Sequence, residues 1–315
     1  MSYYLGIDGG GTKTTCAVGD DHSLLATATA GPSNIVRVGE AQARASLQEA
    51  VRQACAAAGI DPGQVAHTYV GGSGAARPEL AAIVRRSLAE ILSTPIDVVG
   101  DMQIALEAAF DAGPGIVVNA GTGSFAYGRN AQGNTARAGG WGFAISDEGS
   151  AHWIGRSAVS AVLKAADLTG EASEARVLLQ QSPFVAALLK AWGVSSFAYL
   201  ARAANSIPPL DFAALFPAVA GERDDLALQV LTSAGRELAQ LVAVVIRRLF
   251  AGNDVVSVPV AITGSVFRHA PRVCEVFYNE LRRLDSRIET NAQIVEPVEG
   301  ALRLARRAGT RGASS

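Results

Sequence analysis

The chain has 315 residues, of which 49% are hydrophobic and 18% charged, and its formal net charge is -2. This length accommodates two domains with a substantial core, and the near-neutral charge gives no electrostatic basis for binding nucleic acid or an anionic membrane. The longest apolar run, Leu238–Ile246, is far shorter than the ~18 residues of a membrane-spanning helix. We therefore expect neither nucleic acid nor a membrane as a partner.

Location is predicted from the start of the chain and from its cysteines. The first predicted strand begins at Tyr3, and no signal peptide precedes it. Cys16, Cys55 and Cys274 are widely separated and form neither a disulfide framework nor a CxxC metal motif. These features predict a reduced, cytoplasmic protein.

The most informative stretch is a glycine-rich turn directly after the first apolar run. The residues from Asp8 to Thr14 read Asp-Gly-Gly-Gly-Thr-Lys-Thr, which predicts a strand, a tight turn and a returning strand. A turn without side chains lets backbone N–H groups approach phosphate oxygens, and Asp8 at the strand end can hold a metal ion and its waters. The turn lacks the ending of a Walker A loop, and Thr14 replaces the third glycine of a dinucleotide fingerprint. An ordinary hairpin would have a similar sequence.

Apolar periodicity predicts alternating helices and strands along the rest of the chain. The predicted helices are Glu40–Ala58, Pro78–Leu92, Ile104–Phe110, Ser146–Ala166, Glu222–Phe250 and Pro297–Arg307. Short β-like runs lie between them, at Val65–Gly71, Ile96–Val99, Pro259–Thr263 and Ala292–Val295. This alternation is typical of an α/β fold.

An internal repeat predicts two similar halves. The segment Gly115–Gly133 repeats the pattern of Tyr3–His22: an apolar strand, a turn of small and hydroxyl-bearing residues, and a returning strand that ends in a polar hairpin turn. Two glycine turns facing each other across a cleft would form a phosphate clamp. The helix-breaking sequence Gly113-Pro114-Gly115 separates the halves. The expected domains are 1–112, joined by the helix 297–308, and 113–296, followed by a loose tail at 309–315.

Asp101 lies where a buried strand runs directly into a helix. A helix N-cap is the simpler interpretation, since Asp caps helices well. The functional interpretation is a carboxylate at the carboxyl end of a strand, which is a suitable place for a general base. Both can hold together.

A third cluster, Ala138–Ser150, combines glycines, a tryptophan and two acids before a helix. The structural interpretation is a glycine loop with a core tryptophan and a helix cap. The functional interpretation is a polar ligand site, because many neighbouring side chains can bond hydroxyl groups. Trp141 would form a wall of a sugar site, and Asp147 would accept hydrogen bonds from sugar hydroxyls. We favour the functional interpretation.

Together these motifs resemble the sugar kinase–Hsp70–actin ATPase superfamily, and within it the N-acetylglucosamine kinase branch of the BadF/BadG/BcrA/BcrD ATPase-like family. Asp8–Lys13 resembles the first phosphate motif, Ala120–Ser124 the second, and Gly264–Phe267 the adenosine motif. The resemblance implies an α/β fold of two RNase H-like (actin/hexokinase-type) halves, with a nucleotide and sugar cleft between them. It also implies a homodimer.

The resemblance assigns roles to individual residues. Asp101 falls at the catalytic base, and Asp8 with Asp101 would hold Mg²⁺ through water. The residues at sugar-binding positions are Asn34, Ser73, Gly140, Trp141 and Asp147. The residues at ATP-binding positions are Gly10, Gly11, Thr12, Lys13, Gly121, Thr122, Gly123, Ser124, Gly264, Ser265 and Arg268.

The function implied is ATP-dependent phosphorylation of the 6-hydroxyl of N-acetyl-D-glucosamine. Glucosamine kinase is the nearest alternative, because bacterial glucosamine kinases share this layout. A second alternative is an ATP-driven activator of dehydratases or reductases, which would need paired cysteines for an iron–sulfur cluster. A third is a sugar sensor without catalysis.

The chain departs from the pattern of this branch at Ser146, where many relatives carry glycine.

Overall fold

Two five-stranded sheets carry the fold, one in each part of the chain. The structure is a computed structural model that describes residues 2–169, 173–208, 210–221, 224–251 and 255–312. Unit 1 comprises Met1–Val117 with Val295–Ser315, and unit 2 comprises Val118–Ile294. The division falls inside strand β6 (Gly115–Ala120), a few residues after the boundary expected from the glycine-proline break.

The sheet of unit 1 has the strand order β3-β2-β1-β4-β5. An antiparallel meander joins the first three strands, whereas β4 and β5 run parallel to β1. The carboxyl ends of β1, β4 and β5 therefore meet at one edge, where polar side chains after each strand can gather. The strands are β1 (Tyr3–Gly9), β2 (Thr14–Gly19), β3 (Leu24–Ala30), β4 (Val65–Gly72) and β5 (Ile96–Gly100).

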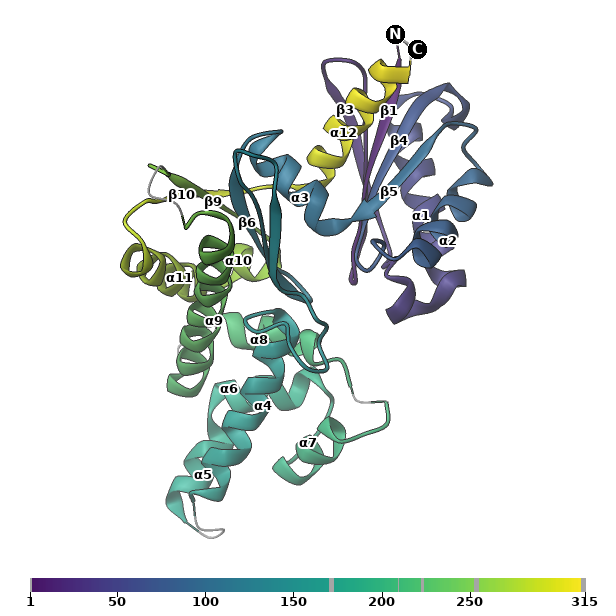
Figure 1. The fold of residues 1–315 in the computed structure, drawn as a ribbon. Coiled ribbons are helices and arrows are strands. Elements are labelled where there is room, and N and C mark those ends of the chain that lie inside the picture. The colour runs from purple at the N-terminus through teal and green to yellow at the C-terminus, as the bar shows by residue number, and fades with distance from the viewer. Residues whose placement is uncertain (1, 170–172, 209, 222–223, 252–254, 313–315) are drawn as a thin grey trace. The chain divides into compact units, whose positions relative to one another are not determined.

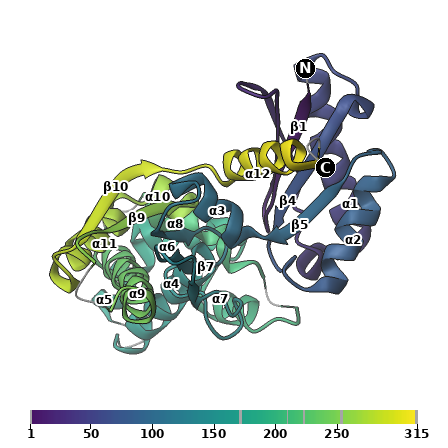
Figure 2. The ribbon, with the colours of Figure 1, turned by 45° about the horizontal axis from the view of Figure 1, so that its top comes forward.

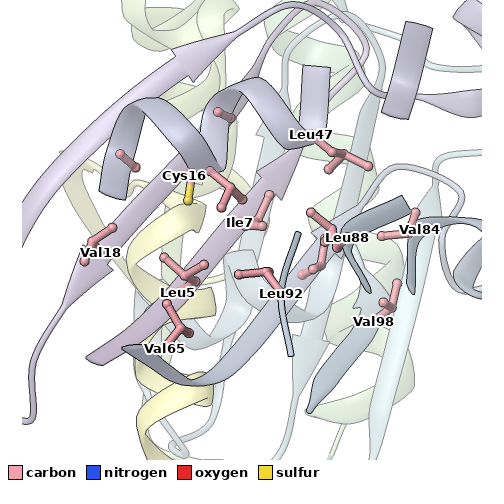
Figure 3. Close-up of a cluster of buried hydrophobic side chains, with 14 of the residues drawn as sticks. Leu5, Ile7, Cys16, Val18, Leu47, Val65, Val84, Leu88, Leu92 and Val98 are labelled. Atoms are coloured by element: carbon pink, nitrogen blue, oxygen red, sulfur yellow. The ribbon is translucent and has the colours of Figure 1, made fainter. Parts of the chain in front are cut away.

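Helices cover both faces of this sheet (Figures 1 and 2). Helices α1 (Ile35–Ala58) and α2 (Pro78–Ala89) lie on one face, and their apolar sides close the core drawn in Figure 3. Helix α12 (Pro297–Gly312) packs on the other face through Val298 and Leu302. Helix α3 (Asp101–Phe110) lies beside α12, and a short 3₁₀ helix, η1 (Pro62–Gln64), precedes β4.

Glycines let α12 approach β1 and α3 closely. A Cβ on Gly6 of β1 would lie 2.3 Å from the backbone nitrogen of Leu302, and one on Gly300 would lie 2.0 Å from the carbonyl oxygen of Ile104. Gly309, further along α12, lies against Tyr4. Helix α12 therefore runs antiparallel to β1, and its amino end points toward the edge that carries Asp8.

Unit 2 repeats the topology of unit 1. Its strand order is β10-β9-β6-β7-β8, so a meander of three strands is again extended on its β6 side by two later strands. Strands β7 and β8 are antiparallel, and β9 and β10 are parallel. This confirms the two similar halves predicted from the internal repeat. The strands after β6 are β7 (Ser124–Arg129), β8 (Thr135–Gly139), β9 (Val258–Thr263) and β10 (Ile288–Ile294).

The helices of unit 2 include one long helix, α9, which packs on β7 and β8 and contacts α4 and α11. None of the helices in the described residues is long and apolar enough to cross a membrane. The helices are α4 (Ala151–Asp167), α5 (Glu174–Gln181), α6 (Pro183–Ala191), α7 (Phe197–Ala204), η2 (Phe212–Leu215), α8 (Phe216–Ala220), α9 (Asp225–Leu249), α10 (Ser265–His269) and α11 (Pro271–Leu284).

Several predicted boundaries were wrong. Helix α1 begins at Ile35 rather than Glu40, because Asn34 caps it, and Gly39 interrupts it with a φ of 78°. Helix α4 begins only at Ala151, after the cap Ser150, and β10 starts at Ile288 rather than Ala292. Helix α12 continues to Gly312, so residues 309–312 are helical and not a loose tail. The remaining tail residues 313–315, and residues 222–223 of the predicted helix Glu222–Phe250, lie outside the described residues.

Candidate active site

The first glycine turn joins β1 to β2 and is closed by its own backbone. The N–H of Gly10 donates to the carbonyl of Lys13 (3.0 Å). Thr14 is buried at the start of β2 and donates its hydroxyl to Ser33 (2.7 Å) and to the carbonyl of Gly31 (2.8 Å). The hydroxyl groups of the returning strand thus fix the turn to the loop before α1, and the side chains of Thr12 and Lys13 stay exposed.

Two further loops bond to the same turn. The carbonyl of Gly10 accepts from the N–H groups of Ser33 (3.1 Å) and Asn34 (3.2 Å), and the carbonyl of Gly9 accepts from the N–H of Ser73 (3.0 Å). Asn34 also caps α1 by accepting from the N–H of Val36 (3.1 Å). The structure therefore brings Asn34 and Ser73, which the sequence predicts to bind sugar, against the first glycine turn.

Asp101 is the first residue of α3, directly after β5. The N-cap of this helix is Gly100, so the interpretation of Asp101 as the N-cap was wrong. Its carboxylate accepts from the N–H of Met102 (3.0 Å), a bond that holds the side chain at the amino end of the helix. Because β5 lies parallel to β4 with Gly100 opposite Gly72, Asp101 lies at the same sheet edge as Ser73.

The carboxyl group of Asp8 is electrostatically unusual. Burial is the main cause that raises its pKa to about 7, and the negative charge of Asp101 adds to the shift. Lys13 opposes the shift, whereas Glu296, just before α12, supports it. Glu296 was missed in the sequence, because only the packing of α12 against β1 brings it near Asp8. Strongly shifted carboxylates of this kind concentrate at functional sites.

This set of donors fits a magnesium ion better than a transition metal. Carboxylate oxygens are hard ligands, and Mg²⁺ is typically held by one or two carboxylates, by waters and by the phosphates of a substrate. Within the described residues no three His, Cys, Asp or Glu side chains form a ready cage for a metal ion. Asp8 and Asp101 are therefore suited to hold Mg²⁺ only together with waters and a bound phosphate.

In unit 2 the second glycine turn joins β6 to β7 and contacts the loop before α4. The carbonyl of Gly121 accepts from the N–H of Ala151 (2.8 Å), and the hydroxyl of Ser124 donates to the carbonyl of Glu148 (2.7 Å). The loop residue Ser146 donates its hydroxyl to the carboxylate of Glu148 (3.0 Å). The turn and the start of α4 thus form one hydrogen-bonded assembly.

Asp147 lies inside this assembly. It has a φ of 64°, which is rare for a residue other than glycine, and burial raises the pKa of its carboxyl group. Its carboxylate accepts from the N–H of Gly142 (3.3 Å), and a Cβ on Gly123 would lie 2.8 Å from it. Asp147 therefore bonds the glycine loop and lies against the second turn. The sequence did not indicate this structural role.

The predicted adenosine motif also reaches the second turn. Gly264 has a φ of 105°, and a Cβ there would lie 2.4 Å from the carbonyl oxygen of Ala120 at the end of β6. Only glycine allows β9 and α10 to pass this close to the turn. Ser265 and Arg268 follow on α10 and are exposed.

Trp141 projects from the glycine loop between β8 and α4. Its side chain is 68% exposed, which rules out the core tryptophan considered above. The guanidinium carbon of Arg137 lies 4.3 Å from the centroid of its ring. The adjacent Gly142 bonds Asp147, so Gly140, Trp141 and Asp147 belong to one loop. This loop lies in unit 2, whereas Asn34, Ser73 and Asp101 lie in unit 1.

The profile of the BadF/BadG/BcrA/BcrD ATPase family matches residues 5–305, which is nearly the whole chain. The chain belongs to this family. A curated N-acetyl-D-glucosamine kinase of Dictyostelium discoideum is 31% identical over 261 residues, 78% of this chain and 80% of the relative. A curated N-acetylmuramic acid/N-acetylglucosamine kinase of Clostridium acetobutylicum is 38% identical over 173 residues. That match covers 54% of this chain and 56% of the relative's length.

Solved structures agree with the family assignment. A protein of Chromobacterium violaceum described as a candidate N-acetylglucosamine kinase matches with a TM-score of 0.71 and 25% identity, over 97% of this chain and 99% of the other. A ROK family glucokinase from Streptomyces griseus, solved with glucose and AMPPNP, matches with a TM-score of 0.61 at 16% identity, over 97% and 100% of the chains. The second likeness concerns the fold alone, and it is the sugar kinase fold predicted for this BadF/BadG/BcrA/BcrD family member.

Proposed function

We propose that the protein is an ATP-dependent amino-sugar kinase that phosphorylates the 6-hydroxyl of N-acetyl-D-glucosamine. The observation that carries the proposal is the edge of the unit 1 sheet, where Asp101, Asn34 and Ser73 all adjoin the turn after Asp8. A general base and two hydrogen-bonding side chains beside a phosphate turn suit the phosphorylation of a sugar hydroxyl. Two curated relatives are named as kinases of this sugar.

In the proposed reaction Asp101 accepts the proton of the sugar hydroxyl. The hydroxyl oxygen then forms a bond to the γ-phosphorus, the bond from that phosphorus to the β–γ bridging oxygen breaks, and ADP leaves with the electron pair. Asn34 and Ser73 orient the sugar ring. A positioned base of this kind contributes roughly 10²–10⁴-fold to the rate.

ATP would be held by both glycine turns and by the loop at Gly264. Backbone N–H groups and hydroxyls of the turns would bond phosphate oxygens, and Lys13 would add a positive charge. A bound Mg²⁺ ion would neutralise charge on the β- and γ-phosphates, with Asp8 and Asp101 as its acidic partners. The sugar-facing part of unit 2 would be Gly140 and Trp141. The turn residues proposed to bind ATP are Gly10, Gly11, Thr12, Gly121, Thr122, Gly123 and Ser124.

The test is ADP release measured with Mg-ATP and N-acetylglucosamine, glucosamine, glucose or no sugar. Stimulation by N-acetylglucosamine, with phosphate found on the 6-oxygen by NMR, is the expected result. Preference for glucosamine would replace the proposed substrate by its free amine. Hydrolysis that is independent of sugar, or none at all, would remove the kinase proposal in favour of an activator or a sensor.

We further propose a homodimeric state and a cytoplasmic location. The resemblance implies a homodimer, which light scattering of the purified protein would test. It also implies a cytoplasmic enzyme, and cell fractionation would test this. The cysteines do not favour the activator alternative: Cys16 and Cys55 are buried in unit 1 and Cys274 is half-buried on α11, so none is exposed for a cluster.

A further inference from the structure

A small cavity lies within unit 1, between the first glycine turn and the helices α1 and α2. Its volume is about 10 Å³, which is the room that one group of the size of a water molecule needs. Gly9 and Ser73, which bond one another at the first turn, both line it. The cavity is therefore continuous with the proposed sugar-binding edge of the sheet.

The floor of this cavity is apolar. Leu47 of α1, Val70 of β4 and Val84 of α2 line it and are buried members of the core, where Figure 3 shows Leu47 and Val84. These three side chains are pure hydrocarbon, so they offer no hydrogen bond to a water molecule. At the rim Ile35 and Leu80 are only half-buried, which leaves a way in from solvent.

The mouth of the cavity is polar. Ser33 lines it and is buried, and its hydroxyl accepts a hydrogen bond from Thr14 at 2.7 Å. A hydroxyl group that accepts one bond can still donate its own proton, here to a carbonyl oxygen at the mouth. Asn34 and Ser73, the proposed sugar-binding residues, lie next to Ser33 and on the facing loop. A ligand that suits this place has a polar base and a short apolar tip.

Two glycines allow the loops around the mouth to approach closely. A Cβ on Gly9 would lie 2.8 Å from the hydroxyl oxygen of Ser33, and one on Gly72 would lie 3.0 Å from the Cβ of Ala75. The sides of the cavity are thus closed by tightly packed backbone. Its depth is set by the side chains that α2 contributes, Leu80 and Val84.

We propose that this cavity holds the methyl group of the N-acetyl substituent of the acceptor sugar, and that Val84 and Leu80 limit the length of the acyl chain. The methyl group is the shortest apolar tip, and the amide carbonyl stays at the mouth, where Ser33 donates to it. A charged free amine gains nothing from an apolar cavity. The inference rests on the proposed function, because it assigns the acyl part of the same acceptor site.

The probes are glucosamine derivatives whose N-acyl group lengthens by one carbon at a time: formyl, acetyl, propionyl and butyryl. Val84→Ala deepens the cavity, and Val84→Ile fills it with one further methyl group. The matched controls are Val51→Ala and Val51→Ile. Val51 of α1 is buried in the same core but does not border the cavity.

We expect kcat/KM of wild type to fall roughly 10–200-fold from the acetyl to the propionyl sugar, as for one methylene group in a tight apolar pocket. In Val84→Ala the ratio of kcat/KM for propionyl to that for acetyl rises about tenfold. In Val84→Ile the ratio for acetyl to that for formyl falls about tenfold. Both Val51 variants keep the ratios of wild type.

Leu80→Ala is a second variant that enlarges the cavity from its half-buried rim, where less core packing is lost. It should raise the ratio for propionyl to acetyl as Val84→Ala does. Two results overturn the inference: wild type uses the propionyl and butyryl sugars as well as the acetyl sugar, or folded Val84 and Leu80 variants keep the acyl preference of wild type. The cavity would then be a packing defect without a ligand.

Calorimetry of sugar binding without nucleotide separates this inference from the proposed function. If the acyl sugars bind in the expected order and Val84→Ala changes that order, but no phosphate is transferred, the kinase proposal fails and the acyl site stands. If N-acetylglucosamine is phosphorylated but the order of binding is the same in wild type, Val84→Ala and Leu80→Ala, only the acyl site fails.

Discussion

The two glycine turns occupy equivalent places in two sheets of the same strand order, but the acidic residues beside them are held differently. Around the first turn Asp8 experiences the negative charges of Asp101 and Glu296, with Lys13 as the opposing charge. Around the second turn Asp147 also experiences a negative charge, that of Glu148, but its carboxylate accepts a hydrogen bond from the N–H of Gly142. The two turns thus share a strand order, whereas the proposed base Asp101 and the proposed magnesium-binding residue Asp8 lie at the first turn.

The largest effect is expected at the first glycine turn, from the substitution of Asp101. Asp101→Asn keeps the shape of the side chain but removes the proton acceptor, so kcat should fall roughly 10²–10⁴-fold while ATP still binds. The measurement is coupled ADP release with N-acetylglucosamine, together with calorimetry of ATP binding.

The control for Asp101 is Asp97→Asn on the same strand. Asp97 pairs with His67 at 2.8 Å, away from the first turn, and its loss should leave kcat near that of wild type. Nearly full turnover in Asp101→Asn would refute the assignment of the base.

At the second glycine turn the largest loss of stability should come from added side-chain volume, because α10 begins so close to it. Gly264→Ala places a methyl group 2.4 Å from the Ala120 carbonyl oxygen at a φ of 105°, which should cost about 2–4 kcal/mol in the free energy of unfolding. Thermal unfolding should show a Tm lowered by roughly 5–15 °C, together with weakened ATP binding.

Gly133→Ala separates crowding from backbone strain. Gly133 has a similar φ of 82°, but a Cβ there meets nothing within 4 Å. This variant should cost only about 1 kcal/mol. Equal losses in the two variants would show that the close approach to the second turn is unimportant.

How much could be predicted from the sequence depended on whether the signal was local. The glycine turns, the repeat and the α/β alternation are local patterns, and the structure has the corresponding elements. Glu296 beside Asp8, and Arg137 on Trp141, are contacts created by packing, and no sequence pattern specifies them. Asp147 was assigned to sugar binding from its loop, but its hydrogen bond to Gly142 became visible only in three dimensions.

A smaller effect is expected at the first glycine turn, where Asp8 should make the stability of the fold depend on pH. The carboxyl group of Asp8 has a pKa of about 7 in the folded protein, whereas the ordinary pKa of an aspartate, expected in the unfolded state, is 3.8. Between these pH values the folded state therefore binds more protons than the unfolded state. Stability from this group therefore falls as the pH rises from about 4 to 7. Without nucleotide or metal, Asp8→Asn should remove this fall and raise the Tm at pH 8 by a few degrees relative to wild type.

Asp20 supplies a control of opposite sign. Backbone N–H groups of His22 and Ser23 lower its pKa, so the stability it contributes is present above the pKa of the unfolded state and is lost as the pH falls through the folded value. Asp20→Asn should therefore leave the profile between pH 5 and 8 unchanged. A profile of Asp8→Asn that runs parallel to wild type over this range would contradict the raised pKa.

The smallest effect concerns Glu296, the acid that α12 brings to the first turn. Its charge is one cause of the raised pKa of Asp8, so Glu296→Gln should lower that pKa, and by less than the effects of burial and Asp101, which precede it in size. NMR titration of ¹³C-labelled aspartate carboxyl groups would follow the shift directly.

Glu299→Gln is the control. Glu299 also lies near the amino end of α12, but its carboxylate faces Arg303 at 3.9 Å. Identical titration of Asp8 in both variants would mean that Glu296 does not reach the site. A lower pKa of Asp8 in Glu296→Gln alone would show that the amino end of α12 contributes to the electrostatics of the first glycine turn. The acidic residues that act on this turn would then come from three separate segments of the chain, at Asp8, Asp101 and Glu296.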